Sequence, residues 1–64
     1  DTARKIYEQY VTQEPNDAVG FNNLGVVLES LGRRVEAIQA YEQSVQVNSG
    51  YHNGISNLRR LRGF

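Results

Sequence analysis

The sequence contains no cysteine and only one histidine, His52. Small secreted domains often gain stability from disulfides, and structural metal domains bind their ion through sets of cysteine and histidine side chains. Neither is available to this chain. A protein of 64 residues buries only about 60% of the surface that its unfolded chain exposes. We therefore expect its stability to depend on contacts with a partner or with neighbouring segments.

An excess of one charge is also lacking, because Lys and Arg number 7 and Asp and Glu number 7. With a net charge of zero, no overall field attracts nucleic acid or an anionic membrane surface. No apolar stretch approaches the roughly 18 residues of a membrane span, and the start does not resemble a signal peptide. We expect neither nucleic acid nor a membrane as a partner, and the composition leaves the compartment open.

The sequence repeats itself with a period of 34 residues. Shifting the 64 residues by this period leaves 30 aligned pairs, and eight of them are identical, where ordinary composition gives on the order of two. The identical pairs are Ala3 and Ala37, Tyr7 and Tyr41, Glu8 and Glu42, Gln9 and Gln43, Val11 and Val45, Gly20 and Gly54, Asn23 and Asn57, and Leu24 and Leu58. A period of this size is typical of stacked helical units.

Two helices are predicted within the one complete period, residues 16–49. The first has Asn16 or Asp17 as its N-cap and ends at Gly32, which can adopt the left-handed turn. Its apolar residues recur at three and four positions and are Phe21, Leu24, Leu28 and Leu31. The second has the same spacing in Ala37, Ile38, Tyr41 and Val45, and ends at residues 48–50. A connection of about three residues makes the two helices an antiparallel hairpin.

Half a repeat flanks this unit on each side. Residues 1–15 contain the stripe of a second helix, ended by Pro15, which disfavours helical geometry at the preceding residue. Residues 50–64 contain a first helix, from about His52 to Arg62, that belongs to a following or capping unit. The predicted class is therefore all-α, an antiparallel helix-hairpin repeat with about four helices. Because the chain opens on Asp1, within a helical pattern, we expect it to be an excerpt of a longer protein.

The complete period resembles a known family. The residues Phe21-x-x-Leu24-Gly25-x-x-Leu28, then Ala37-x-x-x-Tyr41, then Ser49 resemble the tetratricopeptide repeat pattern of aromatic, Leu-Gly, large residue, Ala, aromatic and Pro. Pro15, one period before Ser49, has the proline that Ser49 replaces. The resemblance covers nearly the whole chain.

The resemblance implies roles for the small and aromatic positions. Gly25 and Ala37 are expected to let the paired helices approach closely, while Tyr41 fills the wider gap between units. Arg59 stands where Gly25 would recur. We therefore do not expect the last helix to pair closely with a following helix, which argues against a complete third repeat.

The sequence offers no clustered base, nucleophile and orienting group, so we expect neither an enzyme nor a cofactor. His52 is interpreted as a solvated histidine in the turn before the last helix. Glu8 and Glu42 are interpreted as solvated charges and not as a paired-carboxylate site. The four tyrosines are interpreted as packing residues with a solvated hydroxyl, and they are Tyr7, Tyr10, Tyr41 and Tyr51.

A basic cluster lies in the last helix at Arg59, Arg60 and Arg62. It could contact phosphates if it formed a stripe, but aromatic interleaving and net positive charge are both absent. The alternative is that cations near a helix C-terminus stabilise the helix. Arg33 and Arg34, after Gly32, are interpreted in the same way.

The candidate binding surface lies on the first helices, which line the concave side of stacked hairpins. The predicted peptide-binding residues are Asn22, Asn23, Val26, Asn57 and Arg60. The resemblance implies that Asn23 and Asn57, each directly before a leucine, hydrogen-bond the backbone of a bound peptide. The alternative is that they are tolerated polar residues on an exposed face. An acidic group of the ligand is expected nearest Arg60.

Two functions are compatible with this pattern. The first is a protein-protein interaction scaffold that binds an extended peptide or partner protein on the concave face. The second is a self-assembly element that forms homo-oligomers through its exposed half-repeat faces. Ile6, Tyr7, Tyr10 and Leu61 are expected to be covered by further chain in the first case, and by another copy in the second. We expect the isolated chain to self-associate.

Overall fold

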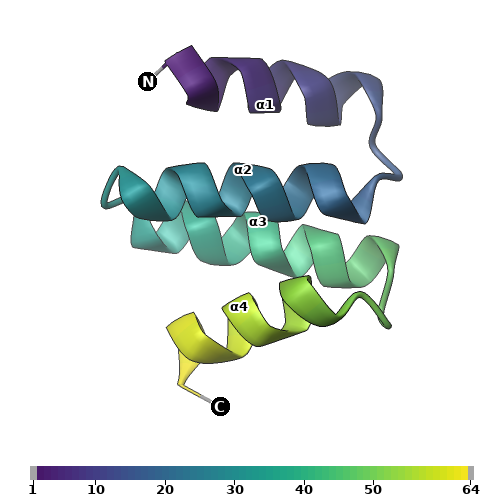
Figure 1. Ribbon diagram of the computed structural model, residues 1–64, viewed down its shortest axis with the longest axis vertical. Coiled ribbons are helices and arrows are strands. Elements are labelled where there is room, and N and C mark those ends of the chain that lie inside the picture. The colour runs from purple at the N-terminus through teal and green to yellow at the C-terminus, as the bar shows by residue number, and fades with distance from the viewer. Residues whose placement is uncertain (1, 64) are drawn as a thin grey trace.

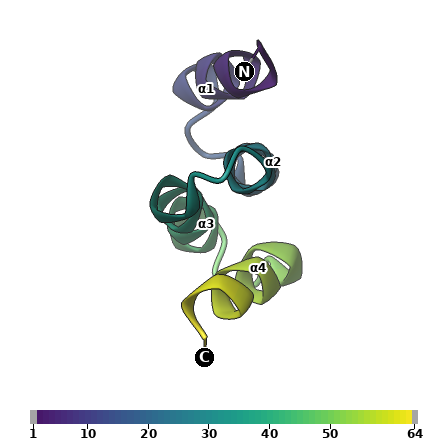
Figure 2. The same cartoon turned by 90° about the vertical axis from the view of Figure 1, so that its left-hand side faces the viewer.

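The structure is a computed structural model that describes residues 2–63 and contains four helices. Their bounds are α1 (Thr2–Gln13), α2 (Ala18–Ser30), α3 (Arg34–Val47) and α4 (His52–Arg62). Residues 2–63 include no strand. Successive helices run antiparallel and are stacked in one row (Figure 1), and α2 and α4 lie on the same side of α3 (Figure 2). The all-α class and the order of helices predicted from the repeat are confirmed.

The predicted start and stop of α2 are both present. The Asp17 carboxylate accepts hydrogen bonds from the backbone N–H of Val19, at 3.0 Å, and of Gly20, at 3.2 Å. It thereby satisfies two of the donors that a helix start leaves unpaired. At the other end Gly32 has φ of +78°, and its N–H bonds the carbonyl of Glu29 while the next N–H bonds that of Leu28. This is a Schellman ending, which requires a left-handed residue.

The other helices end close to the predicted positions. The helix α1 ends at Gln13, two residues before Pro15, and α3 ends with Asn48 as its C-cap. The helix α4 is closed by Gly63, with φ of +85°. Asp1 and Phe64 are the outer ends of the predicted ranges 1–15 and 50–64, and both lie outside the described residues.

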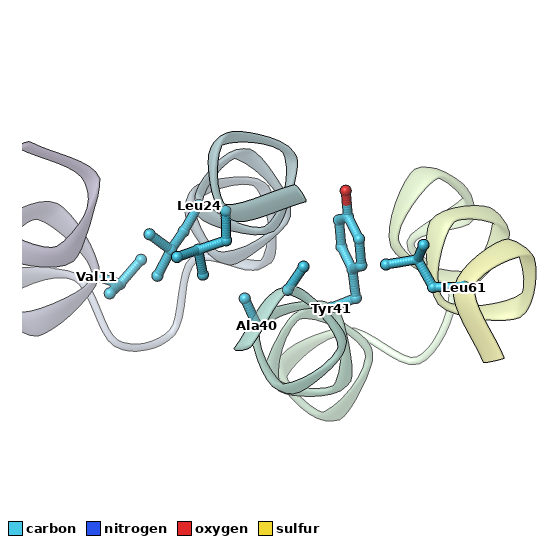
Figure 3. Packing of buried hydrophobic residues seen from close by; sticks show 7 residues of the cluster. Val11, Leu24, Ala40, Tyr41 and Leu61 are labelled. Atoms are coloured by element: carbon cyan, nitrogen blue, oxygen red, sulfur yellow. The ribbon is translucent and has the colours of Figure 1, made fainter. Parts of the chain in front are cut away.

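The core is formed where α2 and α3 pack together, which is the most extensive helix contact. Its buried residues are Val11, Leu24, Leu28, Ala37, Ala40, Tyr41 and Leu61. Tyr41 is 0% exposed, and Leu61 from α4 points toward its ring (Figure 3). Leu61 is only 7% exposed, so the expectation that it needs a cover from outside the chain is wrong. Leu61 belongs to α4 and is already buried in the core cluster beside α3.

Gly25 lets α2 approach α3 closely, as expected, and the side chain nearest to it is that of Tyr41. A Cβ atom at Gly25 would lie 2.5 Å from Cε1 of the Tyr41 ring. Contacts under about 3 Å between carbon atoms are strongly repulsive. Glycine is therefore required because the ring occupies the space of its missing side chain. Tyr41 lies between α2 and α4 (Figure 3), which agrees with the expectation that it fills the gap between units.

The contact that α1 makes with α2 recurs between α3 and α4. A Cβ at Gly20 would lie 2.6 Å from Tyr10 of α1, and a Cβ at Gly54 would lie 2.7 Å from Ser44 of α3. Gly20 and Gly54 are one period apart, and so are Tyr10 and Ser44. The same position on a second helix thus meets the same glycine on the next first helix, as expected for a repeat with constant geometry.

Candidate peptide-binding face

The five predicted binding residues lie on two neighbouring helices. Asn22, Asn23 and Val26 belong to α2, and Asn57 and Arg60 belong to α4. These helices are in contact and lie on one side of the molecule (Figure 2). The structure therefore brings the predicted residues into one region. We call the exposed surface formed by Val19, Asn23, Val26, Asn57 and Arg60 the α2–α4 face.

Asn22 is an exception, because it is only 6% exposed. The sequence pattern placed it among the residues outside the core, and that placement is wrong. Its Oδ1 accepts a hydrogen bond of 2.9 Å from Nδ2 of Asn57. A buried amide needs such a partner, because leaving it unpaired costs about 1–3 kcal/mol. Asn22 therefore joins α2 to α4, and its role toward a ligand stays a prediction.

A continuous polar network connects the two helices. Arg60 donates two hydrogen bonds to the carboxylate of Glu29, of 2.5 and 2.8 Å, in a bidentate arrangement. The same guanidinium donates to Oδ1 of Asn57 at 3.1 Å, and the Tyr41 hydroxyl donates to Glu29 at 3.0 Å. With the Asn22 amide, this network joins α2, α3 and α4. We call it the Glu29 network, and its members are Asn22, Glu29, Tyr41, Asn57 and Arg60.

The Glu29 network changes the acidity of its members. Hydrogen bonding to the Arg60 guanidinium lowers the pKa of Glu29 below its usual 4.5. Burial, together with the hydrogen bond to Glu29, raises the pKa of Tyr41 to about 12. Hydrogen bonding to Glu29 raises the pKa of Arg60. At neutral pH the three groups are therefore a carboxylate, a neutral phenol and a guanidinium, each in its hydrogen-bonding form.

The network limits the hydrogen-bond donors that Arg60 has free for a ligand. Its side chain is 52% exposed, and that of Glu29 is 30% exposed. The cation is thus accessible, but its bidentate donor pair already faces a carboxylate. A ligand carboxylate at this point has to compete with Glu29. In contrast, Val26 is 48% exposed and Asn23 is half-buried, and neither is a member of the Glu29 network.

Glu29 and Tyr41 were not among the predicted site residues. A signal for Glu29 was present in the sequence. Arg60 corresponds to Val26 after one period, and Glu29 lies one helical turn beyond Val26. Opposite charges one turn apart on equivalent helices can meet across a repeat. The hydroxyl of Tyr41 was expected to be solvated, and this expectation is wrong, because Tyr41 is 0% exposed and its hydroxyl donates to Glu29. The sequence had no signal for this bond.

The residues considered for other chemistry lie on the surface. His52 is the first residue of α4 and not part of the preceding turn, and its Nε2 lies 3.5 Å from the Ser56 hydroxyl. Glu8 pairs with Arg4 at 3.0 Å, and Glu42 pairs with Arg62 at 3.1 Å. Among residues 2–63, no three His, Cys, Asp or Glu side chains are grouped so that they could hold a metal ion. No described helix combines the length and the apolar character that crossing a membrane requires.

Comparison with known proteins gives one informative relative. No family model matches the sequence, and no solved structure matches it. The chain is 44% identical over 41 residues to the cytochrome c-type biogenesis protein CycH of Bradyrhizobium diazoefficiens. This match covers 64% of the chain but 11% of the relative, so the chain spans a small part of that protein's length. The chain is thus a four-helix domain with distant similarity to a biogenesis protein.

Proposed function

We propose that the chain is a protein-protein interaction scaffold of the tetratricopeptide type, and that it binds an extended segment of a partner across the α2–α4 face. The observation that carries the proposal is the register of this face. Asn23 on α2 and Asn57 on α4 are one period apart on adjacent helices. The Asn23 amide can donate to and accept from a peptide backbone. The Asn57 amide keeps one N–H and one acceptor lone pair for a ligand beyond its bonds to Asn22 and Arg60.

The exposed valines support an extended ligand. Val19 and Val26 are each 48% exposed, on the outer side of α2. They lie on either side of Asn23 at helical spacing, so an extended segment that bonds the amide can place apolar side chains against them. The Glu29 network fixes α2 against α4. The face is then organised before a ligand arrives, which lowers the ordering cost of binding.

The sequence analysis expected a ligand carboxylate nearest Arg60, and the bidentate pair with Glu29 qualifies this expectation. An acidic ligand group gains little unless it displaces Glu29, since both compete for the same donors. We therefore propose that the ligand is held mainly through its backbone and apolar side chains. Glu29→Gln removes the competing charge and should strengthen the binding of peptides that carry a carboxylate near Arg60.

The experiment is a peptide screen followed by calorimetric titration of variants. Asn23→Ala and Val26→Ser change only the exposed part of the face and should each weaken binding. Loss of one backbone hydrogen bond costs on the order of 1 kcal/mol, which is roughly a fivefold change in Kd. Gln43→Ala, an exposed position on α3, is the matched control. If this control weakens binding as much as the two face variants, the assignment of the face is wrong.

Asn57→Ala and Arg60→Ala belong in a second set. Both residues connect α2 to α4 through hydrogen bonds. Each substitution therefore weakens the packing of these two helices as well as changing the α2–α4 face. Unfolding curves of these variants must accompany the titrations. The proposal requires a loss of affinity at temperatures where both variants remain folded.

The relative suggests which ligands to test first. It is named for cytochrome c-type biogenesis, and segments of c-type cytochromes are therefore the first peptides for the screen. Self-assembly through the half-repeat faces is the competing function. It stays a prediction, and sedimentation of the chain in the absence of peptide distinguishes it from the scaffold function.

A further inference from the structure

Asn22 is nearly buried, yet one of its polar atoms has no hydrogen-bond partner. The residue is 6% exposed, and its Oδ1 accepts from Nδ2 of Asn57. Its own Nδ2 donates to no group within residues 2–63. Every fully buried side-chain nitrogen or oxygen in this part of the chain is paired, so the Nδ2 of Asn22 reaches the surface. Buried side chains normally have their polar atoms paired, and this donor is available to a ligand.

The Glu29 network determines which atom of the Asn22 amide is left open. Arginine has only donors, so Asn57 must turn its oxygen toward Arg60, at 3.1 Å. The nitrogen of Asn57 then faces Asn22, and the atom of Asn22 that meets it, at 2.9 Å, must be the oxygen. Turning either amide over would oppose two donors or two acceptors. The open atom of Asn22 is therefore its nitrogen.

The surface at this amide pair consequently offers more donors than acceptors. Within residues 2–63 both N–H groups of Asn22 Nδ2 are unpaired, and Asn57 Nδ2 has a second N–H beyond its bond to Asn22. The oxygen of each amide already accepts one bond, from Asn57 and from Arg60 respectively. An oxygen of the ligand therefore gains more here than an N–H of the ligand.

The favoured ligand oxygen is a neutral carbonyl and not an anion. Arg60, which donates to Asn57, is paired with the Glu29 carboxylate at 2.5 and 2.8 Å. The pair has no net charge. A carboxylate or phosphate at this place meets the repulsion of Glu29 as well as the attraction of Arg60, whereas a carbonyl oxygen only needs the N–H groups.

We propose that the ligand of this surface is a proline-rich segment whose carbonyl oxygens accept hydrogen bonds from Nδ2 of Asn22 and of Asn57. This inference rests on the proposed function and names the class of its ligand. Proline has no N–H, so such a segment brings acceptors without donors that need partners. Its extended form is preset and leaves the carbonyls open, which lowers the ordering cost of binding. Val19 and Val26, three residues before and four after Asn22, are each 48% exposed and offer apolar contact to the proline rings.

The test titrates the isotope-labelled full chain with a capped oligoproline of about eight residues. We expect a Kd below about 1 mM and shifts of the side-chain amide resonances of Asn22 and Asn57. A capped peptide of the same length that alternates alanine and serine has a backbone N–H at every residue. It should bind at least about fivefold more weakly. Acetate is the probe for an anion and should leave the Asn22 amide resonances unchanged up to about 10 mM.

Asn22→Asp isolates the open donor. Aspartate keeps an oxygen for Nδ2 of Asn57 but has no N–H, so the oligoproline should bind at least about fivefold more weakly. Gln43→Glu adds the same charge at an exposed position of α3 and should not change the Kd. Unfolding curves show whether Asn22→Asp is folded at the temperature of the titration. Where it is not, the Asn22 amide resonances of the native chain decide.

The inference is overturned by oligoproline that does not bind up to about 1 mM or binds without shifting the Asn22 amide. It is also overturned by equal binding of the alanine and serine peptide, by a shift of that amide with acetate, or by unchanged affinity of folded Asn22→Asp. An alanine and serine peptide that binds the α2–α4 face equally well leaves the scaffold function standing. Shifts confined to the surface around Gln43 contradict both.

Discussion

At the scale of single residues, Gly25 is the position where added volume has the largest predicted effect. Gly25→Leu should strongly destabilise the fold, because the new side chain enters the space of the Tyr41 ring. Overpacking of this kind costs typically about 1–3 kcal/mol. The Tyr41 ring, at 0% exposure, has little room to move. Thermal unfolding followed by circular dichroism measures the effect.

Gly50→Ala is the control for this substitution. Only Asn48 Oδ1 lies within reach of a Cβ at Gly50, at an ordinary 3.6 Å. Exposed substitutions of this kind usually change the free energy of unfolding by less than about 0.5 kcal/mol. An unfolding midpoint of Gly25→Leu that matches the control would contradict the packing of Tyr41 described above.

Glu29 should make the free energy of unfolding depend on pH in the acid range. Its pKa is lowered in the folded chain, chiefly by the hydrogen bond to Arg60. The folded state therefore prefers the carboxylate, and this contribution is fully present above the unfolded pKa of 4.5. It is lost as the pH falls below that value through the folded pKa. The unfolding midpoint should accordingly decline below about pH 4.5, and less steeply in Glu29→Gln than in the native sequence.

Asp17 provides the comparison, because the pKa of this carboxyl is also lowered, by hydrogen bonding to Tyr10 and then to backbone N–H groups. In Asp17→Asn the unfolding midpoint should depend less steeply on pH over a separate part of the same acid range. If Glu29→Gln leaves the pH profile unchanged while Asp17→Asn flattens it, the Glu29 network does not contribute to stability in solution.

The sequence analysis identified important single positions more successfully than the residues that they contact. Gly25 stood out through the family pattern, but spacing alone could not say that it meets Tyr41. Asn22 was assigned to the surface because it lies outside the apolar stripe of its helix, yet it is buried with an amide partner from α4. Such pairs depend on side-chain rotamers across a repeat, which a helical periodicity does not determine.

At the scale of helices, the start of α2 depends on Asp17. Asp17→Ala should destabilise the chain by about 1 kcal/mol, since two backbone N–H groups lose their acceptor. Tyr10 also loses the carboxylate to which its hydroxyl donates, which loosens α1 from the start of α2. Chemical denaturation measures this loss. Asn16→Ala, one residue earlier, should have little effect, and equal effects of the two changes would show that Asp17 is not the cap.

Helix boundaries were the best-predicted feature of the fold. Asp17, Gly32 and Pro15 each act through local backbone chemistry, which the sequence displays directly. The structure places α2, α3 and α4 close to the expected spans. The surface between α2 and α4 was less predictable. It depends on how far one unit rotates on the next, and this rotation follows from packing and not from local preference.

At the scale of the whole molecule, Arg59 should limit growth of the chain into polymers. Arg59→Gly restores the pattern of Gly25 and should let the α4 helix of one copy pack on the exposed side of α1 of the next, where Ile6 lies. Head-to-tail contacts form rings where the rotation between copies closes and open chains where it does not, and both are larger than one copy. Sedimentation velocity over a concentration series should show larger species for Arg59→Gly than for the native sequence.

Arg59→Gln separates volume from charge in this experiment. Glutamine removes the cation but keeps a side chain too large for the contact with a tyrosine ring. It should therefore sediment like the native chain. If Arg59→Gln assembles as strongly as Arg59→Gly, the charge of residue 59 and not its volume is what keeps copies apart.

The position of α1 at the edge of the row affects how readily this helix opens locally. This helix lies against α2 but not against α3 or α4, and Val11 is its one buried residue among those described. Opening α1 therefore exposes Val11 and the core contact of Tyr7 but leaves the hairpin of α2 and α3 intact. Its amide hydrogens should exchange with solvent deuterium through local fraying, fastest near the N-terminus, while those of α2 and α3 await global unfolding.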